Sequence, residues 1–155
     1  MKITDILDES CVTTEITSTT KKEVVTELVE LLEKNKKIKK KDEVVKILLD
    51  REKLGSTGIG YGIAIPHGKS DQVDTLLAAF GLCKQGVDFD SLDGAPVNLF
   101  FLLITPTKEA SGAHLKALAK ISGLLKDKLF RQELLDAKNS KEIYSLIKRE
   151  ESRNS

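Results

Sequence analysis

Two segments near the start of the chain place apolar residues at the spacing of an amphipathic helix. The first follows residues 20–23, Thr-Lys-Lys-Glu, which fit a capping box in which the Thr and Glu side chains satisfy free backbone N–H groups. A second helix is expected over residues 42–53, and Gly55 is well placed to end it, because helix ends often need a left-handed residue. The positions expected to face a core are Val24, Val25, Leu28, Leu31 and Leu32 in the first helix and Val44, Val45, Leu48 and Leu49 in the second.

The middle of the chain carries two apolar runs that are typical of strands, at residues 76–82 and 97–104. The second run, Val-Asn-Leu-Phe-Phe-Leu-Leu-Ile, is almost continuously apolar, as expected of a central strand that is covered on both faces. Between the two runs, the Asp93-Gly94 pair gives residues 88–96 the chemistry of a turn.

Three helical segments are predicted after the second strand. The third starts at Ser140 as its cap, and residues 149–155 have the composition of a frayed polar tail. Strands mixed with helices predict an α/β fold, with a mixed β-sheet sandwiched between helices. We expect a single domain over residues 1–150, followed by a polar C-terminal tail at residues 151–155. The apolar positions expected to face inward are Leu115, Leu118, Ile121 and Leu125 in the first helix, Phe130, Leu134 and Leu135 in the second, and Ile143 and Ile147 in the third.

Charge and composition restrict the class of partner. The 155 residues include 25 Lys and Arg against 24 Asp and Glu, and a net charge of +1 gives no general attraction to nucleic acid or to an anionic membrane. Residues 34–41 hold six lysines, which could mark a nucleic-acid contact, but no aromatic residue is interleaved. We interpret this segment as a solvated connection between helices. No apolar run approaches the roughly 18 residues that span a bilayer, and the N-terminus lacks a signal-peptide pattern, so we expect a cytoplasmic protein without direct membrane insertion.

Cysteine and histidine are too sparse to suggest a metal site. Cys11 and Cys83 are expected to pack as small buried hydrophobes, since a disulfide framework or a thiolate zinc site needs more sulfur. A site built on His67 and His114 would have to recruit carboxylates, and none lies at a recognisable ligand spacing. We expect no metal.

Glycine is concentrated in residues 55–68, which hold five of the ten glycines of the chain. Such loops make tight turns and can direct backbone N–H groups at an anion. Gly55 and Gly60 have the spacing of a Walker A motif, but Tyr61-Gly62 stands where Lys-Ser/Thr is required. The spacing G-x-G-x-x-G of a dinucleotide-binding turn is also absent, so nucleotide binding is the weaker hypothesis.

The glycine-rich loop leads to His67, between Pro66 and Gly68, where little side-chain bulk shields the ring. A neutral imidazole is a competent nucleophile towards phosphorus. The Ser56 and Thr57 hydroxyls, the backbone N–H groups of Gly58 and Gly68, and the cationic Arg51 and Lys69 could stabilise the phosphoryl oxygens. His114 lies at the expected start of a helix, where it could either make a local hydrogen bond or help to hold a phosphate on His67.

The residues quoted above carry a resemblance to a known family. Residues 51–60, Arg-Glu-Lys-Leu-Gly-Ser-Thr-Gly-Ile-Gly, and 62–68, Gly-Ile-Ala-Ile-Pro-His-Gly, closely resemble the signature of the enzyme IIA domains of the fructose–mannitol family (EIIA type 2), which has a nitrogen-regulatory branch. These domains belong to the bacterial phosphoenolpyruvate-dependent sugar phosphotransferase system. The similarity extends to the helix of residues 21–35, the Asp93-Gly94-x-Pro96-Val97 turn and the His114-Leu115 pair.

This resemblance implies a mixed α/β fold and a phosphocarrier role. His67 would be the phosphorylated nucleophile, accepting a phosphoryl group from the phosphocarrier protein HPr or a paralogue and passing it to a cysteine of a IIB domain. His114 would be the second active-site histidine and Arg51 the charged partner. No metal or organic cofactor is implied.

Two further hypotheses stay open. No fused HPr, IIB or membrane segment is present, so we expect a free-standing IIA-like protein, and this leaves the regulatory branch as an alternative. In that branch the phosphorylation state controls binding to target proteins. A small-molecule or nucleotide-binding domain is the other hypothesis, disfavoured by the failed motifs. Protein partners would need exposed apolar surface around His67, to which Tyr61 and Ile59 could contribute.

Overall fold

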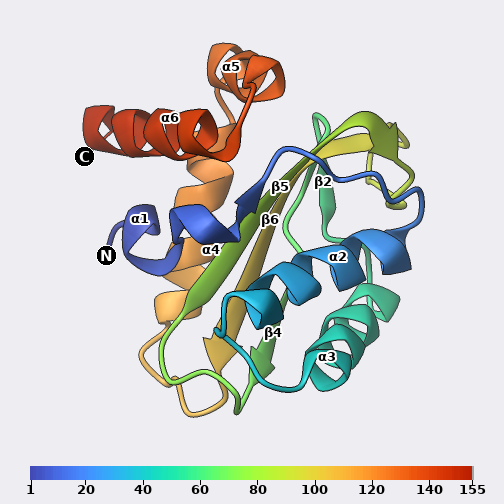
Figure 1. The fold of residues 1–155 in the computed structure, drawn as a ribbon, viewed down its shortest axis with the longest axis vertical. Coiled ribbons are helices and arrows are strands. Elements are labelled where there is room, and N and C mark those ends of the chain that lie inside the picture. Colours follow the sequence, from blue (N-terminus) through green and yellow to red (C-terminus); the bar gives the residue numbers. More distant parts are fainter. Residues whose placement is uncertain (155) are drawn as a thin grey trace.

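The computed structural model describes residues 1–154 as a mixed six-stranded β-sheet between two layers of helices (Figure 1). This confirms the predicted fold class. The sheet order is β1-β5-β6-β3-β2, and β4 also pairs with β6. The strands are β1 Val12–Thr13, β2 Gly58–Gly60, β3 Ile63–Ala64, β4 His67–Ser70, β5 Leu77–Val87 and β6 Val97–Pro106. The helices are α1 Ile3–Ile6, the 3₁₀ turn Glu9–Cys11, α2 Lys21–Lys34, α3 Lys41–Lys53, α4 Ala113–Leu125, α5 Lys128–Asp136 and α6 Ser140–Arg153.

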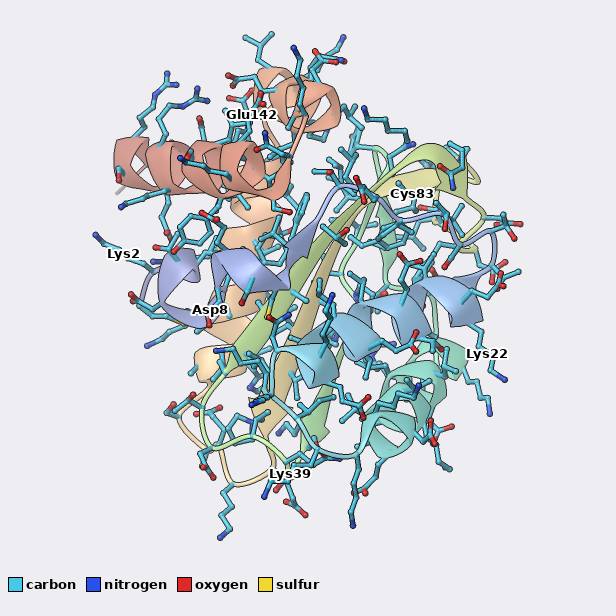
Figure 2. The ribbon with its side chains drawn as sticks, viewed as in Figure 1. Lys2, Asp8, Lys22, Lys39, Cys83 and Glu142 are labelled. Carbon is cyan, nitrogen blue, oxygen red and sulfur yellow. The ribbon has the colours of Figure 1, made fainter. Side chains whose placement is uncertain are left out.

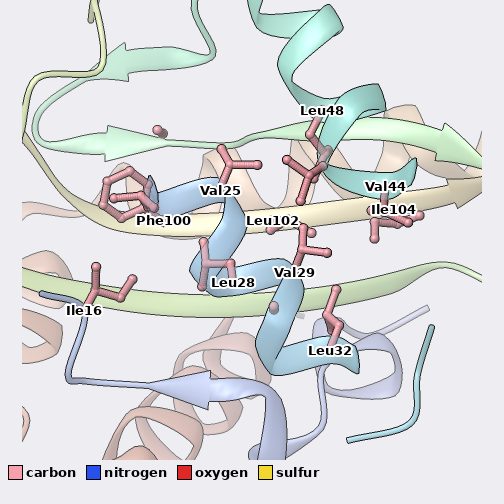
Figure 3. Packing of buried hydrophobic residues seen from close by; sticks show 14 of the residues in the cluster. Ile16, Val25, Leu28, Val29, Leu32, Val44, Leu48, Phe100, Leu102 and Ile104 are labelled. Atoms are coloured by element: carbon pink, nitrogen blue, oxygen red, sulfur yellow. The ribbon is translucent and has the colours of Figure 1, made fainter. Parts of the chain in front are cut away.

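Strand β6 is the centre of the sheet, as its apolar sequence predicts. It pairs antiparallel with β5, with Phe80 opposite Phe101, and parallel with β3 and β4 on its other side. Alternate side chains of a strand point to opposite faces, so β6 supplies residues to both cores. Phe100, Leu102 and Ile104 pack with α2 and α3 (Figure 3), while Leu99, Phe101 and Leu103 pack with α1, α4, α5 and α6.

The first helix pair follows the apolar pattern closely. The Thr20 hydroxyl accepts a hydrogen bond from the Glu23 N–H at 3.2 Å, a cap worth about 1 kcal/mol. The Glu23 carboxylate accepts in turn from the Thr19 N–H at 3.4 Å. Figure 3 shows Val25, Leu28, Val29 and Leu32 of α2 directed at the sheet.

The lysine-rich segment connects α2 to α3, as expected. Lys34 is the last residue of α2 and Lys41 the first of α3. Lys37 and Lys41 form ion pairs with Asp8 and Glu30, and Lys39 projects outward from the connection (Figure 2). Both cysteines are free and buried, as predicted.

The C-terminal region differs from the predictions in two ways. Ser140 is not the cap of α6: Asn139 accepts from the Glu142 N–H at 2.9 Å, while the Ser140 hydroxyl donates to the Val12 carbonyl. The prediction of a frayed tail from residue 149 is also wrong, because α6 continues to Arg153. The boundary proposed at residue 150 therefore falls inside α6. Arg149 forms a two-point ion pair with Glu133 of α5, at 3.0 and 2.7 Å, which holds this turn in place. Residue 155, the end of the predicted tail, lies outside the described residues.

Within residues 1–154, no helix is both long enough and apolar enough to cross a bilayer.

Candidate functional site

The glycine-rich segment forms a β-hairpin, β2 and β3, at one edge of the sheet. Its tip has positive φ angles at Gly60 (100°), Tyr61 (59°) and Gly62 (76°), and glycine adopts such angles without steric cost at two of these three positions. The Asp93 carboxylate accepts a hydrogen bond from the Tyr61 N–H at 3.1 Å. The hydrogen bond from the Ala95 N–H and, after it, this one from Tyr61 lower the pKa of Asp93. The glycine density therefore serves a tight turn in this part of the segment.

His67 stands where the chain resumes its pairing with β6. Ala64 pairs with Phe100 and His67 with Leu103, and Ile65-Pro66 interrupts the ladder between them. The Ile65 carbonyl lies 2.7 Å from Nδ1 of His67. A carbonyl oxygen can only accept, so Nδ1 of the neutral ring carries the proton and Nε2 carries the lone pair. Nε2 hydrogen-bonds to no other described residue, which leaves it available as a nucleophile.

Helix α3 brings Arg51 to the same place. Helix α3 packs closely against β4 because Gly68 of β4 has no side chain. A Cβ at position 68 would lie 2.7 Å from Cγ2 of Ile47 in α3. Arg51, in the last turn of α3, donates one hydrogen bond to the Gly55 carbonyl at 2.9 Å. A guanidinium has five N–H donors in all, so others remain for an anion.

The start of α4 supplies His114 from the opposite helix layer. Its Nδ1 lies 3.3 Å from a carboxylate oxygen of Glu109, which must accept, so Nε2 is the nitrogen left over. The Ser111 hydroxyl also donates to Glu109, and these bonds, chiefly that from Ser111, lower the pKa of this carboxyl to about 2. The N-terminal end of a helix carries partial positive charge, which favours an anion beside His114.

These elements enclose a pocket of about 430 Å³. His67, His114, Arg51 and Gly68 all line it, so the structure brings together four residues that the sequence singled out. Lys69 lines it as well. The other lining residues are mostly apolar, namely Ile47, Leu54, Leu103, Leu115 and Leu118, with Thr105 and Asp50. The carboxylate of Asp50 pairs with Lys46 at 2.8 Å and Lys53 at 3.5 Å.

Three predicted phosphate-binding residues do not line this pocket. The Ser56 hydroxyl donates to the Phe89 carbonyl at 2.6 Å and accepts from the Gly58 N–H at 3.0 Å. Thr57 is buried, and its hydroxyl donates to the Glu52 carboxylate. The structure therefore places Ser56, Thr57 and Gly58 in the internal hydrogen bonds of the loop.

Sequence reasoning missed the apolar rim of the pocket. Leu54 is 84% exposed and Leu115 is 62% exposed, although the helical pattern had assigned Leu115 to the core. Tyr61 and Ile59, the expected docking residues, do not line the pocket, and the Tyr61 ring contacts the Arg131 guanidinium at 5.0 Å. Its place next to His114 in the sequence was the one feature that could have indicated that Leu115 lines the pocket.

A second, larger pocket of about 600 Å³ lies between α1, α4 and α6. It is lined by Lys2, Lys120 and Lys126 among others, and neither histidine lines it. Among residues 1–154, no three His, Cys, Asp or Glu side chains are grouped so as to hold a metal ion.

Comparison with known proteins identifies the family. Residues 5–150 match the family described as "Phosphoenolpyruvate-dependent sugar phosphotransferase system, EIIA 2". A nitrogen regulatory protein of Bradyrhizobium diazoefficiens is 39% identical over 152 residues, which cover 95% of this chain and 95% of that protein. The fructose-specific EIIABC component of Bacillus subtilis is 41% identical over 147 residues, but these cover only 23% of its length.

The fold agrees with these similarities in sequence. The crystal structure of nitrogen regulatory protein IIA-Ntr from Neisseria meningitidis matches with a TM-score of 0.86 and 36% identity, over 94% of this chain and 98% of that chain. Members of the matched family are components of the phosphotransferase system. With the family match, the relatives and the fold in agreement over almost the whole length, the chain belongs to the EIIA type 2 family of the phosphoenolpyruvate-dependent sugar phosphotransferase system.

Proposed function

We propose that this chain is a phosphohistidine carrier that accepts a phosphoryl group on Nε2 of His67. The observation that carries the proposal is the hydrogen bond from Nδ1 to the Ile65 carbonyl, at 2.7 Å, in a pocket shared with Arg51 and His114. The bond fixes the proton on one ring nitrogen and leaves the lone pair of the other free. An imidazole nitrogen with a free lone pair is a suitable nucleophile for phosphoryl transfer when cationic groups lie beside it.

The donor in this proposal is the phosphohistidine of HPr or an HPr-like carrier. The Nε2 lone pair of His67 forms a bond to phosphorus as the nitrogen–phosphorus bond of the donor breaks, and that electron pair returns to the donor ring. The proton on Nδ1 stays in its bond to Ile65, so one imidazole replaces another without a net proton change. Arg51, His114 and the start of α4 stabilise the charge on the phosphoryl oxygens. The step needs no metal or organic cofactor.

Protein partners have a suitable surface around the pocket. Leu54 and Leu115 are largely exposed and lie among its lining residues, so a partner can bury apolar side chains next to His67. Carrier proteins of this kind must release each other after transfer, and small interfaces suit such transient encounters. We propose a cysteine of a IIB domain as the acceptor in a sugar-transport role.

The second candidate function is regulatory, with the phosphorylation state controlling binding to a target protein. Similarity to nitrogen regulatory proteins over 95% of both lengths, and to IIA-Ntr over 94% of the chain, supports it. Both functions use the same chemistry at His67 and differ in the protein that recognises the phosphorylated surface. Unequal affinity of a target protein for the phosphorylated and unphosphorylated forms would favour regulation. Rapid loss of the label to a IIB cysteine would favour transport.

Intact mass spectrometry after incubation with phosphoenolpyruvate, enzyme I and HPr tests the shared chemistry. The wild type is expected to gain the mass of one phosphoryl group, in an acid-labile form, and His67→Gln none. The nitrogen-branch donor proteins serve as a second donor system. Labelling of His67→Gln to the wild-type level would reject the assignment of this nucleophile.

A further inference from the structure

A buried carboxylate, Glu52, connects α2, α3 and the loop that follows α3. Its side chain is 3% exposed, although it lies at the end of α3 next to the pocket residue Arg51. One oxygen accepts from Lys21 of α2 at 3.2 Å and from the Thr57 N–H at 3.1 Å. The other accepts from the Thr57 hydroxyl. A buried charge is costly unless it is paired and hydrogen-bonded. The Glu52 carboxylate is paired with Lys21 and accepts three hydrogen bonds.

Lys21 makes further contacts beside the one to Glu52. Its ammonium lies 3.2 Å from the Asp90 carboxylate and 4.7 Å from the centre of the Phe89 ring. The Phe89 carbonyl in turn accepts from the Ser56 hydroxyl. The two neighbours of Glu52, Lys21 and Thr57, are therefore tied to the same segment around Phe89 and Ser56.

The Thr57 peptide leads directly to the nucleophile. The Thr57 carbonyl accepts from the Ile65 N–H at 3.1 Å, and the carbonyl of Ile65 accepts from Nδ1 of His67 at 2.7 Å. Glu52 is thus linked to His67 through the backbone N–H and C=O groups of two residues, Thr57 and Ile65, and does not itself line the pocket. The hydrogen bonds therefore run without interruption from Thr57 to the acceptor that sets the tautomer of the ring.

We propose that Glu52 is a positioning residue for phosphoryl transfer, which acts through Thr57 and Ile65 to hold His67 with its proton on Nδ1 and its lone pair on Nε2. This inference rests on the proposed function for its meaning. The geometry that it invokes is testable without any phosphoryl donor. It also gives Thr57 a role different from phosphate binding.

Nitrogen NMR of the imidazole rings tests the proposal, because the shifts of Nδ1 and Nε2 distinguish the two tautomers of a neutral ring. The variants are Glu52→Gln, which keeps the shape and removes the charge, and Thr57→Val, which removes only the hydroxyl contact. Thr57→Ser retains both donors and serves as the conservative rescue. Glu150→Gln is the matched control, since Glu150 is a buried carboxylate, 6% exposed, that pairs with arginines in α6.

The expected result is a single Nδ1–H tautomer of His67 in the wild type, in Thr57→Ser and in Glu150→Gln. A mixture of tautomers is expected in Glu52→Gln and Thr57→Val. The rate of phosphoryl transfer should fall in those two variants by about two- to tenfold, the range for one weakened hydrogen bond. Circular dichroism identifies any variant that fails to fold. If Glu52→Gln fails to fold, the tautomer of His67 in Thr57→Val tests the proposal.

An unchanged His67 tautomer in folded Glu52→Gln or Thr57→Val would overturn the proposal, and so would an equal change in Glu150→Gln. If the wild type accepts no phosphoryl group while the tautomers change as expected, the proposed function fails but the positioning does not.

Discussion

Gly68→Ala tests whether the close approach of α3 to β4 builds the pocket. The added Cβ would lie 2.7 Å from Cγ2 of Ile47, against an ordinary carbon–carbon contact of about 3.5 Å, so α3 or Ile47 must move by roughly 0.8 Å. Cγ2 is attached directly to the Cβ of Ile47 and cannot rotate away as the end of a long side chain can. Overpacking of this kind costs about 1–3 kcal/mol. For a chain of this size each kcal/mol lowers Tm by about 2–4 °C.

The movement has a functional consequence as well. Ile47 is one turn before Arg51 on α3, so displacing the helix displaces the guanidinium relative to His67. Transfer should slow together with the loss of stability, because positioning is central to the chemistry. Urea unfolding and the rate of phosphorylation by a fixed amount of donor measure the two effects.

A double-mutant cycle isolates the contact. Ile47→Ala removes Cγ2, so Gly68→Ala should be less costly in its presence by about 1–3 kcal/mol, the energy of the clash itself. Gly123→Ala is the matched control: a Cβ there meets no atom within 4 Å, and Ala is favoured over Gly in a helix by about 1 kcal/mol. The control should gain stability. Equal stability of Gly68→Ala and wild type, or independent effects of Gly68→Ala and Ile47→Ala, would refute the reasoning.

Further predictions concern Arg51 of the pocket and Glu109, the carboxylate that accepts from His114. Arg51→Ala should slow phosphorylation of His67 by at least tenfold, and Arg51→Lys should restore only part of the rate because lysine lacks the guanidinium fork. Single-turnover kinetics measure both rates, and full activity of Arg51→Ala would remove Arg51 from the site. Glu109 has its pKa lowered from 4.5 to about 2, so its contacts are complete above about pH 4.5 and are lost as the pH falls through about 2. A carboxyl NMR titration should find this midpoint, and Ser111→Ala should raise it; a wild-type midpoint near 4.5 would contradict the hydrogen bonds described for Ser111 and His114.

Local patterns in the sequence predict much of the fold, because helix caps and the burial of apolar faces depend on residues that are close together in the chain. The Thr20 cap, the apolar face of α2 and the doubly buried β6 each follow from residues close together in the chain. The errors at the C-terminus come from longer-range contacts. Ser140 is drawn away from capping by the Val12 carbonyl, and Arg149 is kept helical by Glu133. No local pattern indicates such partners.

The candidate site was likewise predictable only in part. His67 and Arg51 were predicted from residue type and from the family signature. Thr57 was assigned to phosphate because hydroxyls beside glycines suit that role, whereas its partner is a glutamate buried by tertiary packing. The proton on Nδ1 of His67 is set by the Ile65 carbonyl, which lies in the interruption between β3 and β4. Backbone geometry of this kind is invisible in residue identities alone.

The most direct test of the central claim is the position of the phosphoryl group on the His67 ring. Nitrogen-labelled protein, phosphorylated by phosphoenolpyruvate, enzyme I and HPr, would be examined by phosphorus and nitrogen NMR, with His67→Gln as the blank. The geometry predicts one phosphoryl group, attached to Nε2, with the proton retained on Nδ1. Attachment to Nδ1, or to any residue other than His67, would contradict it.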